Sequence, residues 1–176
     1  PLFISRDGIN PVTDLLTVLS ILKKLFFLKP DIYFAFSIKP VIYGSIAAKI
    51  LRIPSIVMIT GLGTGFLLDN WVTRVIKFLY RLSLKGCSTV FFQNADDRNL
   101  FIENNLIHPS IAKLTPGSGI DLNKYKYFEL EDREEVVFLL IARMLWDKGI
   151  KEYIEAAMVI KSRYPKNVRF QLLGPI

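Results

Sequence analysis

Two basic side chains lie where a predicted strand gives way to a predicted helix. Arg143 and Lys148 belong to the segment 142–149, which follows an apolar run and precedes a segment of helical periodicity. In open α/β sheets, ligands bind at the carboxyl ends of the strands. The first turn of a helix adds free N–H groups and a partial positive charge there. Because an arginine can hold two phosphate oxygens and a lysine supplies a point charge, the segment suits a diphosphate. The alternative is that both cations are solvated surface residues.

A second candidate is the loop 116–121, which contains Gly117, Ser118 and Gly119. Two glycines can adopt positive φ and turn successive N–H groups toward an anion. An ordinary turn would have the same composition.

A third candidate is the loop that starts with Thr60, Gly61 and Gly63 directly after a predicted strand. The dinucleotide fingerprint GxGxxG fails here, because Phe66 stands where the third glycine belongs. The loop also lacks the lysine of a phosphate-binding P-loop. Two interpretations remain: a tight loop that brings the backbone close to a ligand, or a purely structural turn.

A predicted helix over 71–85 carries a row of basic residues. Helical spacing places four cations on one face, and aromatic residues accompany them: Arg74, Lys77, Arg81 and Lys85, with Trp71, Phe78 and Tyr80. Such a helix either lies on an anionic membrane surface or packs on the sheet with a solvated basic face.

Composition excludes several classes of site. The net charge of +7 favours anionic partners, but no base-reading or stacking motif points to nucleic acid. Cys87 is the only cysteine and His108 the only histidine, so an internal disulfide, a zinc site and a Ser/His/Asp or Cys/His set are not expected. No apolar run approaches the ~18 residues that span a bilayer. A reducing, cytoplasmic location fits this composition.

Short apolar runs alternate with longer periodic segments along the chain, which predicts α/β architecture with parallel sheets and right-handed crossovers. Asn10 and Asn94 are expected to cap helices. Strands are expected over 32–37, 55–60, 89–93, 112–115, 136–142 and 168–173, with helices over 11–29, 40–52, 71–85, 94–105 and from 150 onward.

The charged stretch 129–135 is expected to link two sheets. We therefore expect two domains, 1–128 and 129–176. The second has room for only two strands and one helix, which bury too little apolar surface to stand alone. Both domains are expected to be truncated.

Several of these segments together resemble the large retaining GT-B glycosyltransferase family (group 1, or family 4, type). The likeness is strongest to members that extend undecaprenyl-diphosphate-linked sugars, including bacillosamine-type acceptors. It is carried by segments 38–49, 60–63, 116–121 with Tyr125, 142–149 and 171–175.

The resemblance implies a GT-B fold of two Rossmann-like domains and transfer of a sugar from a UDP-type donor, with retention, to a glycan or lipid-linked saccharide. Arg143 and Lys148 would be the catalytic and donor-diphosphate residues, helped by residues 117–119, and residues 60–63 would form a loop at the cleft. No metal or cofactor is implied. The expected setting is polysaccharide biosynthesis in the cytoplasm, with peripheral contact at the inner membrane face.

This sequence departs from the family pattern in three ways. It lacks the family's first strand and glycine loop, Thr60 stands where many members have histidine, and the pair of glutamates seven residues apart is missing. Glu152 and Glu155 have a different spacing. The chain by itself is therefore expected to be inactive. Two other interpretations stay open: a non-catalytic α/β module at an anionic membrane surface, and another GT-B enzyme such as a sugar-nucleotide epimerase.

Overall fold

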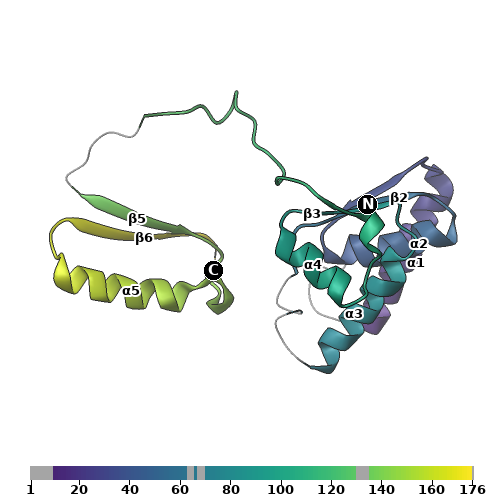
Figure 1. The fold of residues 1–176 in the computed structure, drawn as a ribbon, viewed down its shortest axis with the longest axis horizontal. Helices are drawn as coiled ribbons and strands as arrows, with labels where there is room; N and C mark the ends of the chain where they lie inside the picture. The colour runs from purple at the N-terminus through teal and green to yellow at the C-terminus, as the bar shows by residue number, and fades with distance from the viewer. Residues whose placement is uncertain (1–9, 63–65, 67–69, 130–134, 176) are drawn as a thin grey trace. The chain divides into compact units, whose positions relative to one another are not determined.

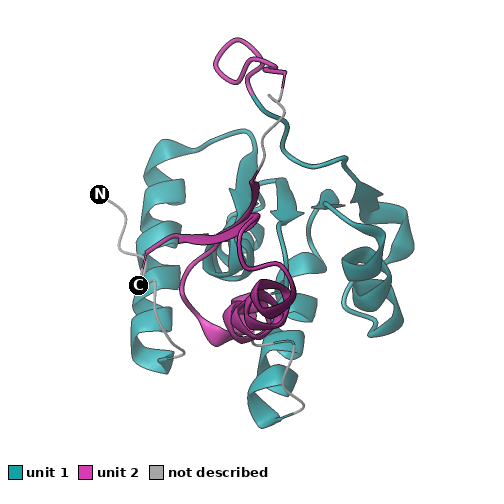
Figure 2. Cartoon of the chain, turned by 90° about the vertical axis from the view of Figure 1, so that its left-hand side faces the viewer, with its two compact units in different colours: residues 1–120 teal, residues 121–176 magenta. Residues whose placement is uncertain are grey.

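The computed structural model describes residues 10–62, 66, 70–129 and 135–175. The chain divides into two compact units, Pro1–Ile120 and Asp121–Ile176 (Figures 1 and 2). This division and the expected domain boundary after residue 128 both fall in the stretch between the last strand of the first sheet and the first strand of the second.

Four parallel strands form the sheet of the first unit, in the order β1 (Tyr33–Phe36), β2 (Ser55–Ile59), β3 (Thr89–Phe92) and β4 (Ala112–Leu114). One row of paired residues across all four strands is buried: Ala35, Val57, Val90 and Ala112. Right-handed crossovers between adjacent parallel strands place their helices on one face of a sheet, and Figure 1 shows the helices gathered there.

The helices of this unit are α1 (Pro11–Leu28), α2 (Ser45–Ile50), α3 (Trp71–Leu84) and α4 (Ala95–Glu103), with the short 3-10 helix η3 (Pro109–Ile111). The two expected caps are confirmed. The Asn10 side chain accepts a hydrogen bond from the Val12 N–H at 3.0 Å, and the Asn94 side chain accepts one from the Asp97 N–H at 2.7 Å. Asn70 caps α3 in the same way.

The segment expected to be one α-helix over 40–52 instead begins as a π-helix, η1 (Pro40–Gly44), before α2 starts. The Tyr33 hydroxyl donates to the Pro40 carbonyl oxygen at 3.0 Å, which gives that oxygen a partner outside the helix. A Cβ at position 44 would collide with the Tyr33 ring, so glycine is required there. Packing against β1 thus accompanies the wider turn.

Aromatic side chains fill the core between α3, α4 and the sheet. The Phe101 ring lies 5.1 Å from that of Tyr80, 5.2 Å from Phe92 and 5.6 Å from Phe66, centroid to centroid. Tyr80 was expected among the aromatic residues that accompany the basic face of α3. That grouping is wrong, because Tyr80 is only 1% exposed and belongs to this core.

The second unit contains the parallel strands β5 (Val136–Ile141) and β6 (Val168–Leu173), the 3-10 helix η4 (Trp146–Lys148) and the helix α5 (Ile150–Arg163). None of residues 135–175 is buried, in line with the small core expected for two strands and one helix. Across the described ranges of both units, no helix combines the length and apolarity needed to cross a bilayer.

Candidate functional site

Arg143 lies at the carboxyl end of β5, where the strand leaves the sheet. Hydrogen bonds to β6 and the residues after it continue on both sides of Arg143, since the Ala142 N–H donates to the Leu173 carbonyl and the Met144 N–H donates to the Pro175 carbonyl, each at 3.0 Å. The Arg143 side chain is exposed, and its guanidinium has no hydrogen-bond or ion-pair partner among the residues that the structure describes. It is therefore available to an external anion.

Lys148 ends η4, and only Gly149 separates it from α5. The Lys148 N–H donates to the Leu145 carbonyl at 3.0 Å, and Gly149 then takes a left-handed conformation at φ 75° as the N-cap residue of α5. The Lys148 ammonium lies 3.5 Å from the Asp147 carboxylate, with side-chain exposures of 42% and 26%. An ion pair this accessible holds the lysine only weakly.

Both cations thus lie at the junction of β5 with the first turn of α5. The first N–H groups of a helix have no acceptor within it, and the helix dipole adds about half a positive charge at that end. Two mobile cations and these N–H groups can surround an anion with several oxygens. The expected placement is present in the structure; diphosphate binding by these residues stays a prediction.

Two residues that were not predicted for this site fix the geometry of the junction. The Tyr153 hydroxyl, on α5, lies 2.8 Å from the Phe138 carbonyl oxygen of β5 and accepts a hydrogen bond from the Gln171 N–H of β6 at 3.1 Å. It ties α5 to both strands. Gly174 follows β6, and a Cβ there would collide with the Ala142 carbonyl. The position of Gly174 at a strand end, next to a proline, is the sequence feature that could have identified it.

In the first unit, the loop after β4 turns on two glycines. Gly117 and Gly119 have φ values of 94° and 71°. Between them, the Ser118 hydroxyl accepts a hydrogen bond from the Gln93 side-chain amide at 2.8 Å, and the Thr115 hydroxyl donates to the Gly117 carbonyl at 3.2 Å. Gln93 follows β3 directly, so the neighbouring strand positions the loop. Gln93 was not among the residues predicted from the sequence, although it follows a strand at the edge that carries the candidate loops.

Thr60 and Gly61 follow β2 at the same edge of the sheet. They line a small pocket together with Ser37, which follows β1 in a left-handed conformation at φ 74°. Gly63, which also belongs to the predicted loop, lies outside the described residues.

The candidates therefore fall into two groups. Residues after β2, β3 and β4 share the carboxyl edge of the first sheet, because all four strands are parallel. Arg143 and Lys148 belong to the second unit. The structure brings Ser118 to Gln93 within the first group, and it brings the two cations to one strand–helix junction within the second.

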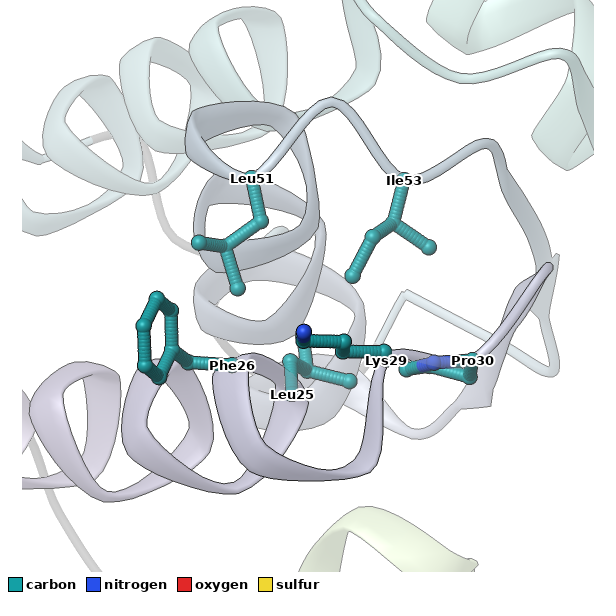
Figure 3. A pocket seen from close by; sticks show the side chains of 6 residues that line it. All are labelled: Leu25, Phe26, Lys29, Pro30, Leu51 and Ile53. Carbon is teal, nitrogen blue, oxygen red and sulfur yellow. The ribbon is translucent and has the colours of Figure 1, made fainter.

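A larger, mostly apolar pocket lies elsewhere in the first unit, between the carboxyl ends of α1 and α2 (Figure 3). Pro30 and Ile53 line it and precede β1 and β2, so the pocket lies at the amino ends of the strands. It includes none of the candidate residues.

Other candidate chemistry is limited. Among the described residues, no three His, Cys, Asp or Glu side chains gather as a metal site would require. Cys87 is buried, and burial raises the pKa of its thiol. Its sulfur lies 3.6 Å from the Ser55 hydroxyl. A protonated, enclosed thiol is a poor nucleophile.

Comparison with known proteins decides the family. The family model described as "Glycosyl transferase 4-like" matches residues 5–94, just over half of the chain. The chain belongs to the glycosyl transferase 4-like family. The matched range contains the loop after β2 but neither Arg143 nor Lys148.

This glycosyl transferase 4-like chain also has a curated relative. It is 32% identical over 191 residues to the N,N'-diacetylbacillosaminyl-diphospho-undecaprenol alpha-1,3-N-acetylgalactosaminyltransferase of Campylobacter jejuni. The alignment covers 97% of this chain and 48% of that protein. The resemblance to bacillosamine-type members is therefore confirmed.

Solved structures share the fold. HepE of Anabaena, in complex with UDP-glucose, superposes with a TM-score of 0.60 at 16% identity over 94% of this chain and 54% of that one. The UDP-N-acetylglucosamine 2-epimerase of Rickettsia bellii gives 0.56 at 16% identity over 96% and 46%. These matches confirm the GT-B fold class. The chain spans about half the length of the relatives it matches.

Proposed function

We propose that this chain is part of a glycosyltransferase that moves a sugar from a UDP-type nucleotide sugar to a lipid-linked saccharide acceptor with retained anomeric configuration. The observation that carries the proposal is the pairing of Arg143 and Lys148 at the junction of β5 and α5, in a member of the glycosyl transferase 4-like family. The Campylobacter relative is named for an undecaprenol-linked acceptor, and the HepE structure holds UDP-glucose. Both names support the substrate classes proposed here.

The proposed role of the two cations is electrostatic. As the bond between sugar C1 and the diphosphate breaks, negative charge grows on the leaving nucleotide. The Arg143 guanidinium, the Lys148 ammonium and the first N–H groups of α5 stabilise that charge. The acceptor hydroxyl oxygen forms the new bond to C1 and releases its proton.

We propose that the reaction needs no metal, because the two cations supply the positive charge that a divalent ion would otherwise provide. EDTA should then leave sugar transfer by the complete gene product unchanged. A loss of activity that Mg²⁺ or Mn²⁺ restores would contradict this part of the proposal.

The first test is calorimetric binding of UDP-sugars to the complete gene product. Arg143→Ala and Lys148→Ala should each weaken binding by tenfold or more, about 1.4 kcal/mol. Lys161→Ala and Arg163→Ala are matched controls, since both cations are exposed on the last turn of the same helix. Unchanged binding in folded Arg143 and Lys148 variants would show that these residues are solvated surface cations and do not bind the donor.

Product analysis separates the proposal from the epimerase alternative. A transferase attaches the sugar to an added undecaprenyl-diphosphate-linked saccharide, and NMR of the product reports whether the anomeric configuration is retained. Conversion of the donor sugar into its epimer without any acceptor would support the other enzyme class. Neither reaction, with UDP-sugar binding intact, would favour a non-catalytic module.

We place the proposed reaction in the cytoplasm, with peripheral contact at the inner membrane face, as part of polysaccharide biosynthesis. A nucleotide-sugar donor and a lipid-linked acceptor meet at such a surface. Fractionation of cells should then recover the protein with membranes at low salt and release part of it at high salt.

A further inference from the structure

A tryptophan stands between the two cations of the β5–α5 junction in the sequence. Trp146 is the first residue of η4, three positions after Arg143 and two before Lys148. It is 78% exposed, and its indole makes no hydrogen bond or ring contact to any residue in the described part of the chain. The indole is therefore open to a ligand that the two cations hold.

The aromatic rings on the strands of the second unit are used differently. The Phe138 and Phe170 rings stack with their centroids 5.0 Å apart, and the Tyr153 ring meets that of Phe170 edge-on at 5.8 Å. These three rings pack β5, β6 and α5 together. Trp146 takes no part in this packing, so the folding of the described residues does not explain an aromatic side chain at its position.

Backbone hydrogen bonds fix the loop that carries Trp146. The Leu145 N–H donates to the Arg143 carbonyl at 2.7 Å, and the Lys148 N–H donates to the Leu145 carbonyl at 3.0 Å. The Trp146 carbonyl accepts from the Gly149 N–H at 3.2 Å. A side chain on a fixed backbone loses less entropy when it is ordered against a ligand, and tryptophan has only two side-chain torsions to fix.

The nucleotide part of a UDP-type donor carries a ring that matches this indole. Uracil is flat and presents two π faces, and aromatic side chains bind nucleobases by stacking on such faces. The ribose joins the base to the diphosphate. A diphosphate held by Arg143 and Lys148 therefore keeps the base tethered near the loop that carries the indole.

We propose that Trp146 is the stacking platform for the uracil ring of the nucleotide-sugar donor. This inference rests on the proposed function, since it concerns the same donor and the same junction, and it adds the residue that holds the base. Because an indole stacks on every base, Trp146 supplies affinity for the nucleotide and leaves the choice among bases to other groups. The transferred sugar is the less suitable partner, since its ring has no π face to stack.

Two probes separate the base from the diphosphate in calorimetry on the complete gene product. UDP carries both groups, whereas inorganic pyrophosphate carries only the charges. Trp146→Ala should weaken UDP binding about tenfold and change pyrophosphate binding by less than about twofold. Trp146→Phe keeps an aromatic ring, so it should weaken UDP binding less than about threefold. Arg143→Ala should weaken the binding of both probes.

Tryptophan fluorescence reports the contact itself. UDP should quench part of the emission of the unmodified protein, and this quenching should disappear in Trp146→Phe. Trp71→Phe is the matched control, because Trp71 is 72% exposed and lies in the first unit. The quenching should persist in that variant. Circular dichroism should not change in any of these variants, since both side chains are exposed.

Three results would overturn the proposal. The first is unchanged UDP binding in folded Trp146→Ala. The second is an equal loss for UDP and pyrophosphate in that variant, which would mean that the substitution disturbs the cations. The third is a loss that appears with a UDP-sugar but not with UDP, which would assign the indole to the sugar.

Failure of the proposed function gives a different result. In that case Arg143→Ala and Lys148→Ala would leave the binding of UDP and of pyrophosphate unchanged. Loss of binding in these two variants, with none in Trp146→Ala, would remove the stacking role alone and leave the donor diphosphate at the junction.

Discussion

Replacing Lys39 with methionine would leave a nearly buried carboxylate without its ion-pair partner. The Lys39 ammonium lies 3.0 Å from the Asp14 carboxylate, and the two side chains are only 17% and 9% exposed. Asp14 is in the first turn of α1, while Lys39 directly precedes η1. The pair therefore fastens α1 to the segment that follows β1.

The size of the effect follows from this burial. Removing one partner of a buried pair costs roughly 3–5 kcal/mol, because the remaining charge is left uncompensated. The residual exposure of Asp14 and its hydrogen bond with the Tyr43 hydroxyl reduce the expected loss for Lys39→Met to about 2–4 kcal/mol. Asp14→Asn should cost less, about 1–2 kcal/mol, since the flexible Lys39 stem can carry its charge to water.

Combining the two substitutions removes both charges at once. The double variant should then be more stable than the sum of the single losses predicts, by about 1 kcal/mol or more. Urea unfolding followed by far-UV circular dichroism at neutral pH measures all three, with Lys24→Met as a control at an exposed position on α1. Losses that add to within about 0.5 kcal/mol would show that the two groups are not coupled and would refute this reasoning.

Two further predictions concern tyrosines. Burial, followed by the charge of Cys87, raises the pKa of Tyr33 to about 12, so the unfolded chain loses this proton near pH 10 while the folded chain keeps it. The contribution of Tyr33 to the free energy of unfolding should therefore be fully present below about pH 10 and be lost between about pH 10 and 12. Alkaline urea titrations should show a smaller fall of this free energy in Tyr33→Phe. Tyr153→Phe removes the hydroxyl that joins α5 to both strands, which should cost about 1 kcal/mol and weaken UDP-sugar binding. Tyr164→Phe, at an exposed ring, should change neither quantity, and unaltered donor binding in Tyr153→Phe would show that the hydroxyl does not position the site.

Local sequence features were sufficient to predict most elements. Asparagines before apolar-periodic segments predicted the starts of α1 and α4, because a helix cap is made by a side chain and the N–H groups two or three residues away. The continuous apolar run at 136–142 predicted a parallel strand, and β5 covers Val136–Ile141. The position of Arg143 and Lys148 between that strand and α5 followed from the same short-range pattern.

Contacts between distant segments decided the rest. The π-helix at Pro40–Gly44 goes with the Tyr33 hydroxyl and ring, which belong to a different element. Tyr80 shares helical periodicity with exposed neighbours, but the rings of Phe101 and Phe66 enclose it. No local pattern reports such pairings, because they depend on which elements the sheet order brings together.

The candidate site divides in the same way. Its charges and glycines were visible in the sequence, since residue type and proximity to a strand end suffice to identify them. Three sets of hydrogen bonds were not visible in the sequence: that of the Gln93 amide to Ser118, those of the Tyr153 hydroxyl to β5 and β6, and those of Lys77 and Arg81 to the residues just after α4. These groups lie between 15 and 27 residues from their partners in sequence, and only the parallel sheets and the helices packed on them bring their atoms within hydrogen-bonding distance.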